Sequence, residues 1–311
     1  MIIRLGYACI CKSLDNVTSS SNYTYTRFKN ANDFSKLDMV IKSNLIDLIR
    51  ILEYNRCNNV HFYRMSSAII PLSTHPQVKF SYGSEYDVYY KKIANILKDS
   101  SMRVDMHPSV YCVLNSTKES VRNNAYEILK YHYDLLDYMG CAKKLILIHV
   151  GSSTFGKEKS LTRFINNFNA LPSYLQECIA IENDDKVFTI DDCLYLSRKL
   201  NIPVVLDYHH FLCNNVGLDV SEYLEEVFLT WKNMRPKIHF SSPKNKRDYR
   251  AHNEFIDSDA FISFLNILKT FDQDVDIMLE AKGCDMSLFR LVRELKYKED
   301  YKFLDDTSFY V

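Results

Sequence analysis

The sequence contains few of the residues that build nucleotide-binding loops. Its 311 residues include only 7 glycines and 7 prolines, and no stretch matches the glycine-rich GxGxxG or Walker patterns. Such loops need glycine because the backbone must approach phosphate groups closely. We therefore expect neither a dinucleotide site nor a P-loop, and no nucleotide cofactor.

Long apolar runs and paired cysteines are also absent. No apolar run approaches the ~18 residues that span a membrane, and the start of the chain lacks the basic residues and long apolar core of a signal peptide. The 9 cysteines are scattered without a CxxC pair, which is typical of reduced thiols in a cytosol-like compartment. We expect a protein that is not secreted, cytoplasmic in a bacterium or nuclear in a eukaryote.

The chain carries no excess of charge of either sign. Lys plus Arg and Asp plus Glu both number 39. This balance argues against a protein that coats nucleic acid without sequence preference, because such binding depends on a positive surface. It leaves room for a local basic patch.

Between positions 204 and 211, an apolar run leads directly into polar side chains, VVLDYHHF. The run follows Pro203 and predicts a strand buried on both faces. Asp207 then lies where the strand surfaces, and His210 lies in the loop just beyond. A carboxylate and an imidazole in that position can bind a divalent metal ion.

Similar segments recur along the whole chain, and apolar runs alternate with segments of helical periodicity. Predicted strands cover residues 2–8, 59–63, 102–106, 144–150, 178–183, 203–207, 237–240 and 275–280. Predicted helices cover residues 37–54, 87–97, 117–139, 161–171, 189–200, 220–231, 259–271 and 286–295. This alternation predicts one α/β domain over residues 1–311, a (β/α)8 TIM barrel.

Histidines and acids gather at the ends of these predicted strands, where the active sites of such barrels lie. The set is His107, His149, Glu182, Asp207, His210, His239, His252 and Glu280. Any one of them has an ordinary structural interpretation, as a buried polar residue with a partner. Together they need counter-charges, which metal ions supply. Their number predicts two or three divalent ions, with Glu182 placed to bridge two of them.

Lys237 lies two residues before His239, so both side chains face the same way on a strand. A lysine beside metal ions either meets a phosphate or has its pKa depressed until the neutral amine reacts. The alternative is a lysine whose ammonium extends to solvent.

The chemistry of this cluster suits phosphodiester hydrolysis, in which one ion activates water and the others neutralise the phosphate and the leaving oxygen. Residues 243–250, PKNKRDYR, add a basic patch beside the metal rim, formed by Lys244, Lys246, Arg247 and Arg250. Its alternative is an ordinary solvated loop. Tyr7 and Tyr111 offer aromatic surface for stacking on bases.

Several motifs resemble the UV damage endonuclease family: LGY near the start, FYRMSS, PLSTHP, HPSVYCVLNS, HVGS, IEND, LDYHH and KIHFSS. The resemblance covers almost the whole chain, in order. It implies a metal-dependent TIM barrel, related to endonuclease IV, that nicks damaged double-stranded DNA on the 5′ side of cyclobutane dimers, 6-4 photoproducts and some abasic sites. It also implies that the strand-end set above holds the metals.

The resemblance extends to residues outside the metal set. Lys237 matches a lysine that family members can carry in carboxylated form, and His75 matches a family position, for which we expect contact with DNA or metal. The family probes the duplex with a Gln-Tyr or Gln-Phe pair from an HPGQ loop. Here Tyr111 is kept, but Ser109 replaces the glycine and Val110 the glutamine, which puts the range of damage recognised in question.

The sequence thus predicts a monomeric DNA repair endonuclease. We assign catalysis to Glu182, Lys237 and Tyr7, with Mn²⁺ as the preferred ion and Zn²⁺, Mg²⁺ or Co²⁺ as alternatives. DNA contact and lesion probing fall to Tyr7, His75, Val110, Tyr111 and the four basic residues of 243–250. Rival interpretations are an abasic-site endonuclease of the endonuclease IV type, a metal-dependent sugar isomerase, and a damage-binding protein with a vestigial site.

Overall fold

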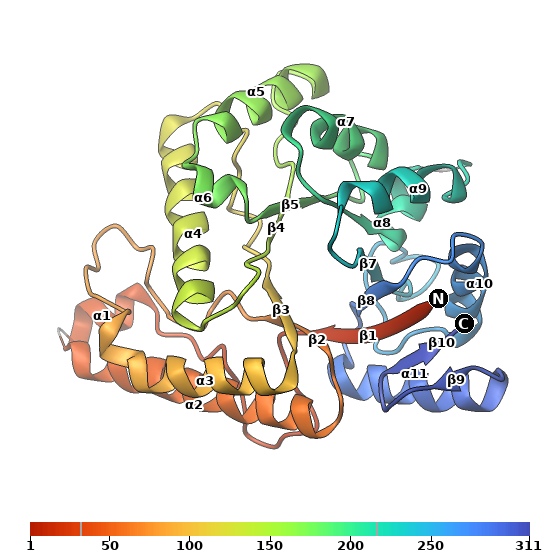
Figure 1. Cartoon of the computed structure of the whole chain (residues 1–311). Helices are drawn as coiled ribbons and strands as arrows, with labels where there is room; N and C mark the ends of the chain where they lie inside the picture. The colour runs from red at the N-terminus through yellow and green to blue at the C-terminus, as the bar shows by residue number, and fades with distance from the viewer. Residues whose placement is uncertain (32, 216) are drawn as a thin grey trace.

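The computed structural model describes residues 1–31, 33–215 and 217–311, and eight parallel strands form a closed barrel at its centre (Figure 1). The strands are β1 (Ile2–Ala8), β2 (Phe62–Met65), β3 (Arg103–Met106), β4 (Ile146–His149), β5 (Ile179–Glu182), β6 (Val204–Asp207), β7 (Lys237–Phe240) and β8 (Val275–Leu279). Each pairs with its neighbour in sequence, and β1 pairs with both β8 and β2. The predicted TIM barrel is therefore confirmed.

The barrel closes where β1 meets β2. Tyr7 and Ala8 pair with Tyr63 and Arg64. Gly6 makes this approach feasible, because a Cβ at that position would lie 2.3 Å from the carbonyl oxygen of Phe62. A side chain at Gly6 would force the two strands apart.

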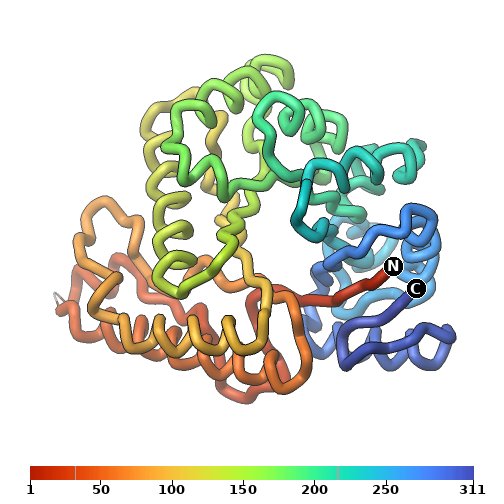
Figure 2. Tube along the Cα trace, in the orientation of Figure 1, coloured from red at the N-terminus to blue at the C-terminus, as the bar shows by residue number. Residues whose placement is uncertain are grey.

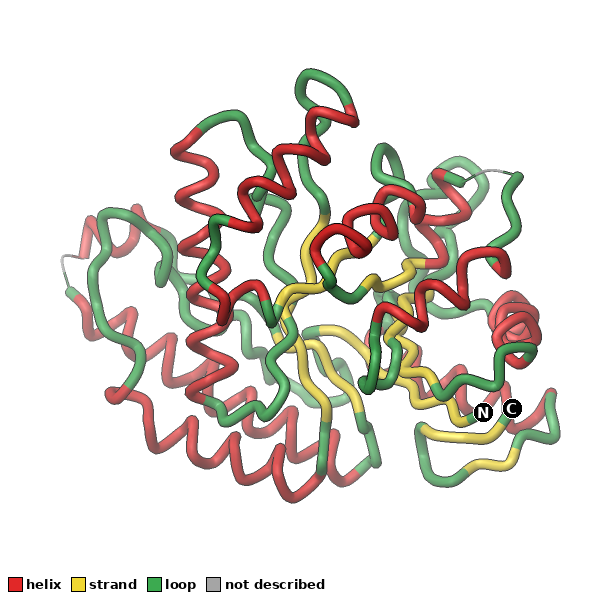
Figure 3. The backbone as a smooth tube through the Cα atoms, turned by 45° about the horizontal axis from the view of Figure 1, so that its top comes forward, coloured by secondary structure: helices red, strands yellow, loops and turns green. Residues whose placement is uncertain are grey.

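Helices surround the strands on the outside of the barrel (Figure 3). The helices that connect successive strands are α2 (Phe34–Cys57), α3 (Asp87–Ser100), α4 (Glu119–Tyr138), α5 (Lys157–Asn169), α7 (Ile190–Leu200), α9 (Ser221–Thr230), α10 (Ser258–Lys269) and α11 (Cys284–Lys298). All eight agree with the predicted helices apart from a few residues at their ends. Within the described residues, no helix is both long and apolar enough to cross a membrane.

Some shorter elements were not predicted. They are α1 (Tyr25–Ala31), the 3-10 helix η1 (Ser84–Tyr86), α6 (Ser173–Gln176) and α8 (Tyr208–Asn214). The predicted loop before α2 thus contains a helix, and its last residue, Asn32, lies outside the described residues. Segments this short carry too few turns for apolar periodicity to indicate a helix.

A C-terminal hairpin was also missed. Strands β9 (Lys302–Phe303) and β10 (Ser308–Tyr310) pair with each other, and β10 runs antiparallel to the start of β1. Both chain ends therefore lie side by side (Figure 2). Asp305 in the hairpin turn accepts from the His61 imidazole at 2.7 Å and so ties the turn to the segment before β2.

Apolar side chains fill two separate regions. The larger one lies between the strands and the helices. The smaller one fills the inside of the barrel and consists of Leu145, Leu147, Ala180, Val205 and Trp231. The Trp231 indole donates to the carbonyl oxygen of Val204 at 2.8 Å, which satisfies its buried N–H. The inside of the barrel is thus packed.

Asp276 on β8 carries the ion pairs at the amino ends of the strands. It is fully buried. Arg4 donates to both of its carboxylate oxygens, at 2.7 and 2.8 Å. Arg103 donates to Oδ2 at 2.8 Å. A buried carboxylate with two guanidinium partners is costly to remove, because the remaining charges are then left uncompensated.

We predict that Asp276→Asn lowers the free energy of unfolding by about 3–5 kcal/mol, the usual loss when one partner of a buried ion pair is removed. Urea unfolding followed by circular dichroism measures it. Asp272→Asn is the matched control: its carboxylate pairs with the N-terminus but is 88% exposed, so its loss should be below about 1 kcal/mol. Equal effects of the two substitutions would contradict this account.

Candidate metal centre

The carboxyl ends of the strands bring the predicted acids and histidines to one mouth of the barrel. In the β4–β5 pairing His149 lies opposite Glu182. In the β6–β7 pairing Asp207 lies opposite His239. Because side chains at paired positions of adjacent strands point the same way, both pairs face the barrel axis. The sequence pattern and the register together assemble the site.

Glu182 lies at the centre of the cluster and is almost completely buried, with 2% of its surface exposed. Its Oε1 lies 2.9 Å from Nε2 of His107 and 3.0 Å from Nε2 of His149. Its Oε2 lies 2.8 Å from Nδ1 of His239. Imidazoles from β4, β7 and the loop after β3 thus converge on one carboxylate.

Two groups of ligand atoms in the described residues have the spacing of a metal site. The first is His107, His149 and Glu182, and the second is Glu182, Asp207 and His239. Within each group the ligand atoms lie within 4.8 Å of one another. Glu182 is common to both groups.

His210 approaches the second group from α8. Its Nδ1 lies 3.5 Å from Oδ2 of Asp207 and 3.0 Å from the carbonyl oxygen of Asn183. The prediction that His210 lies in a loop is wrong: Asp207 is the N-cap of α8 and accepts from the His210 backbone N–H at 2.8 Å. One carboxylate therefore both starts the helix and faces the site.

Glu280 and His252 complete the predicted set on the other side of His239. Oε1 of Glu280 lies 3.3 Å from Nδ1 of His239, and its Oε2 lies 3.9 Å from Nδ1 of His252. His252 lies beyond the end of β7, but a bridge between Pro243 and His252 folds the intervening loop back on itself. The structure thus brings all eight predicted ligands to one end of the barrel.

Arg64 and Asp105 belong to the site although the sequence analysis did not select them. Arg64 donates to Oε1 of Glu280 at 2.6 Å and contacts Nε2 of His239 at 2.7 Å. Asp105 is fully buried on β3, two residues before His107. The period of two along a strand could have identified Asp105. Arg64 stands within the FYRMSS motif, but only the strand register shows its partners.

Lys237 is fully buried below the ligands, and its ammonium lies 2.5 Å from Oδ2 of Asp105. The alternative in which this lysine extends to solvent is wrong. Burial lowers the pKa of Lys237 to about 8, although Asp105 opposes the shift. Its carboxylation stays a prediction, and in this arrangement the amine is engaged with Asp105.

Neighbouring charges shift the pKa values of Glu182 and His210 at the site in opposite directions. Burial alone would raise the pKa of the Glu182 carboxyl, but the surrounding imidazoles outweigh it and the pKa lies well below its usual value. Burial would lower the pKa of His210, yet Asp207 and the nearby glutamates raise it to about 9. Glu182 is therefore ionised, which is the form that binds metal ions.

Unpartnered buried atoms show that the cluster fits divalent ions. Oε2 of Glu182, Oδ2 of Asp207 and Nδ1 of His149 are buried and form no hydrogen bond in the described structure, although imidazole nitrogens lie close to both oxygens. Leaving such atoms unpaired is costly unless a ligand satisfies them. Carboxylate oxygens and imidazole nitrogens suit manganese, zinc and related divalent ions. The residues present could therefore hold the ions that the sequence predicts, and nothing in their chemistry selects one metal.

Two predicted DNA contacts are placed elsewhere. Tyr7 is fully buried, and its hydroxyl donates to Oδ1 of Asn55 in α2 at 2.6 Å. Tyr7 thus faces the helix layer on the outside of the barrel, so the prediction of an exposed stacking surface at Tyr7 is wrong. His75 stacks on Tyr25, with ring centroids 4.2 Å apart, and belongs to neither group of ligand atoms.

The other predicted contacts are exposed around the mouth. Val110 and Tyr111 in the loop between β3 and α4 are 77% and 73% exposed. Lys244, Lys246 and Arg247 are exposed in the loop between β7 and α10. Arg250 of the same loop lies 3.3 Å from Oδ2 of Asp185. Lys244 also lies 3.7 Å from Oδ2 of Asp248 in the same loop. Contact of this loop with DNA stays a prediction.

A cavity of about 350 Å³ adjoins the first group of ligand atoms. Its walls come from the loops after β3, β4 and β5, and include Val110, His149, Gly151 and Asp184. The cavity therefore connects the exposed loop of Val110 to a metal-ligand candidate.

Sequence comparison identifies close relatives. A family model described as UV-endonuclease UvdE matches residues 3–307. A UV DNA damage endonuclease of Bacillus cereus (strain G9842) is 38% identical over 301 residues, covering 95% of each chain. The enzyme of the same name from Bacillus anthracis is 36% identical over 301 residues, again 95% of each chain.

Structural comparison agrees with these relatives. The crystal structure of SacUVDE superposes with a TM-score of 0.87 at 38% identity, covering 95% of this chain and 98% of that one. Endonuclease IV from Thermus thermophilus gives a TM-score of 0.57 at 13% identity, covering 94% and 98%. L-ribulose 3-epimerase gives 0.54 at 14% identity, covering 89% and 81%. The last two likenesses show a shared fold alone.

We predict that Glu182→Gln weakens Mn²⁺ binding at least about 10-fold, because it removes the charge shared by both ligand groups. Equilibrium dialysis followed by elemental analysis gives the affinity and the number of ions per chain. Glu226→Gln, an exposed carboxylate on α9, is the control and should bind Mn²⁺ like the unchanged chain. Unaltered binding by Glu182→Gln would remove this residue from the metal centre.

Proposed function

Because the chain belongs to the UV-endonuclease UvdE family, we propose that it is a DNA repair endonuclease that depends on divalent metal ions. The observation that carries this proposal is the position of Glu182, which is shared by two groups of ligand atoms at the mouth of the barrel. Sites with two or more ions suit in-line displacement at phosphorus, because both the attacking and the leaving oxygen need stabilisation.

The proposed reaction is hydrolysis of the backbone immediately 5′ to cyclobutane dimers and 6-4 photoproducts, with abasic sites as further substrates. The named relatives act on UV-damaged DNA, which supports this substrate class. Bound metal ions would supply the positive charge that polarises the phosphate and lowers the pKa of water. Mn²⁺ remains the proposed ion.

The residues of this chain hold the ligands in place. Glu182 would bridge the two metal positions, and Asp207 would support the second while it caps α8. Arg64 on β2 contacts both Glu280 and His239 from inside the barrel. We propose that Lys237 serves catalysis indirectly. Its ammonium neutralises Asp105 and so holds in place the buried residues that support the metal ligands. Tyr7 would contribute only by packing behind the site.

DNA would approach the exposed loops around the mouth. Tyr111 offers an aromatic ring and Val110 an apolar wedge, and both lie beside the cavity or on its wall. Side chains of this kind enter a duplex where bases leave the stack. The basic loop of Lys244, Lys246 and Arg247 would bind phosphates on one flank.

An abasic-site endonuclease is the second candidate. Val110 favours it, because an apolar side chain fills a gap in the stack but cannot hydrogen-bond the exposed bases of a photoproduct. The likeness to endonuclease IV is in fold alone. A sugar isomerase has less support, since a small-molecule substrate leaves the exposed Tyr111 and the basic loop without use.

We predict that the Mn²⁺-loaded protein cuts an end-labelled duplex containing a single cyclobutane dimer at the phosphodiester immediately 5′ to the lesion. Glu182→Gln should reduce the rate at least about 100-fold, because multi-metal stabilisation is worth several kcal/mol. Gel mapping of the products gives the cut site and the rate. Parallel duplexes contain an abasic site or no lesion, and Glu226→Gln is the control variant.

The outcomes separate the candidates. Cleavage confined to the abasic duplex would replace the photoproduct assignment with the second candidate. If the metal-loaded protein cuts none of the three duplexes, the nuclease proposal fails.

We predict that Tyr111→Ala weakens binding to the dimer-containing duplex about 5- to 100-fold, because stacking of an aromatic ring on a base is worth ~1–3 kcal/mol. Fluorescence anisotropy with labelled DNA measures the affinity. Tyr297→Ala is the matched control, because this tyrosine on α11 is 91% exposed. If both variants bind like the unchanged chain, Tyr111 does not contact the lesion.

A further inference from the structure

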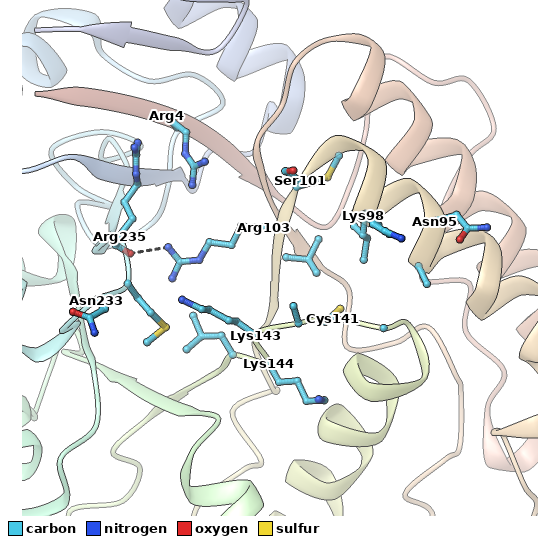
Figure 4. Close-up of a pocket in the computed structure, with 18 residues that line it drawn as sticks. Arg4, Asn95, Lys98, Ser101, Arg103, Cys141, Lys143, Lys144, Asn233 and Arg235 are labelled. Atoms are coloured by element: carbon cyan, nitrogen blue, oxygen red, sulfur yellow. Dashed lines mark hydrogen bonds between the residues drawn. The ribbon is translucent and has the colours of Figure 1, made fainter.

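A second cavity, of about 700 Å³, lies among the segments that lead into the strands (Figure 4). Its wall is formed by β1, β3, the end of α3, and the loops before β4 and β7. β3 relates it to the metal centre: Arg103 at the start of the strand lines the cavity, and His107 just after its end faces Glu182. The two sites are therefore at opposite ends of the barrel.

Basic side chains dominate this cavity. Six of the lining residues are cationic: Arg4, Lys98, Arg103, Lys143, Lys144 and Arg235. No lining residue within the described parts of the chain carries a carboxylate. Figure 4 shows Arg4, Arg103 and Arg235 together on one side, with Lys143 beneath Arg103, and Lys98 and Asn95 on α3 across from them.

Nearby carboxylates neutralise only part of this charge. Asp276 pairs with Arg4 and Arg103, and Asp274 pairs with Arg235 at 2.9 Å. Three guanidinium groups thus share two carboxylates. Lys144 is neutralised separately by Asp137 at 3.0 Å.

The remaining positive charge belongs to groups with unused donors. Nη1 of Arg235 is buried without a hydrogen-bond partner in the described structure. Lys98 and Lys143 are exposed at the cavity and form no ion pair with any described residue. An unpartnered buried guanidinium nitrogen is costly, and an anion would satisfy it.

The remaining walls are apolar or neutral. Leu97, Met102, Val104 and Met234 line the cavity together with the amides of Asn95 and Asn233. Pockets of ~300–1,000 Å³ hold small organic ligands, so the volume exceeds what a bare phosphate needs. Apolar walls with a few amides suit the body of a ligand, and the cations suit its charged end.

We propose that this cavity binds a small phosphate-bearing molecule of nucleotide size. Arg103, Arg235, Lys98 and Lys143 would hold the phosphate, because guanidinium forks and ammonium groups are the usual phosphate donors. The apolar wall would take the remainder of the ligand. This proposal does not depend on the chemistry of the metal centre.

Isothermal titration of AMP and of inorganic phosphate into the metal-loaded full chain tests this proposal. We expect one AMP site per chain, with weaker binding of inorganic phosphate because it leaves the apolar walls empty. Lys98→Ala with Lys143→Ala should weaken AMP binding at least about 10-fold, because it removes two charged donors for the phosphate. Both lysines are exposed, so the fold should be unchanged.

Two controls locate the binding site. Lys244→Ala with Lys246→Ala removes the same charge at the other end of the barrel, and Glu182→Gln disables the metal centre; AMP affinity should survive both. The Lys98/Lys143 double variant should also cut DNA at the normal rate. The proposal would be overturned if AMP binding were lost in the Lys244/Lys246 variant or in Glu182→Gln but kept in the Lys98/Lys143 variant. The absence of binding, or equal affinity for AMP and phosphate, would also overturn it.

Discussion

The ionised carboxylate of Glu182, buried among imidazoles at the mouth of the barrel, is the interaction on which the rest of the site depends. A charge in that position is stable only if other charges surround it. His107, His149 and His239 approach it within 3.0 Å. Their spacing leaves buried oxygen and nitrogen atoms without partners, which divalent ions would satisfy.

Strand β3 shows how the barrel extends this arrangement inward. Arg103 and Asp105 on β3 and His107 just after its end face the axis in turn, because side chains alternate along a strand. Arg103 binds Asp276, Asp105 binds Lys237, and His107 meets Glu182. A basic side chain therefore faces a carboxylate at each level, and Arg64 links Asp105 to the ligand candidate His239.

The surface around the mouth has the opposite character. Ligand candidates are buried and mutually supported, whereas Val110 and Tyr111 are largely exposed and free to meet a partner. A rigid buried centre beneath exposed loops is the arrangement in which a damaged strand could be held open while its backbone reaches the ligands. The cationic cavity at the other end belongs to neither part, which is why we assign it a ligand of its own.

Much of this arrangement follows from sequence pattern. Apolar runs such as 204–206 located all eight barrel strands, and the last six of these strands contain or precede the acids and histidines that are the ligand candidates. The pattern did not reveal Arg64, because its partners Glu280 and His239 come from strands that only the closed register brings together. The pattern also misplaced Tyr7. A tyrosine at the end of a strand can point to the mouth of the barrel or to a helix such as α2, and the sequence does not show which.

Short elements were beyond the same reasoning. The helix α8 spans Tyr208–Asn214 and starts because Asp207 caps it, a local hydrogen bond that periodicity does not detect. The hairpin of β9 and β10 is held by its pairing with β1 across the whole length of the chain. Long-range pairing of this kind leaves little trace in composition or spacing.

The most direct test of the account is anomalous diffraction from crystals of the protein loaded with Mn²⁺. We expect at least two manganese peaks, with Glu182 between them. One should lie beside His107 and His149, and the other beside Asp207 and His239. Manganese peaks that lie away from Glu182, or none at the mouth of the barrel in fully loaded protein, would contradict the central claim that this carboxylate joins two metal positions.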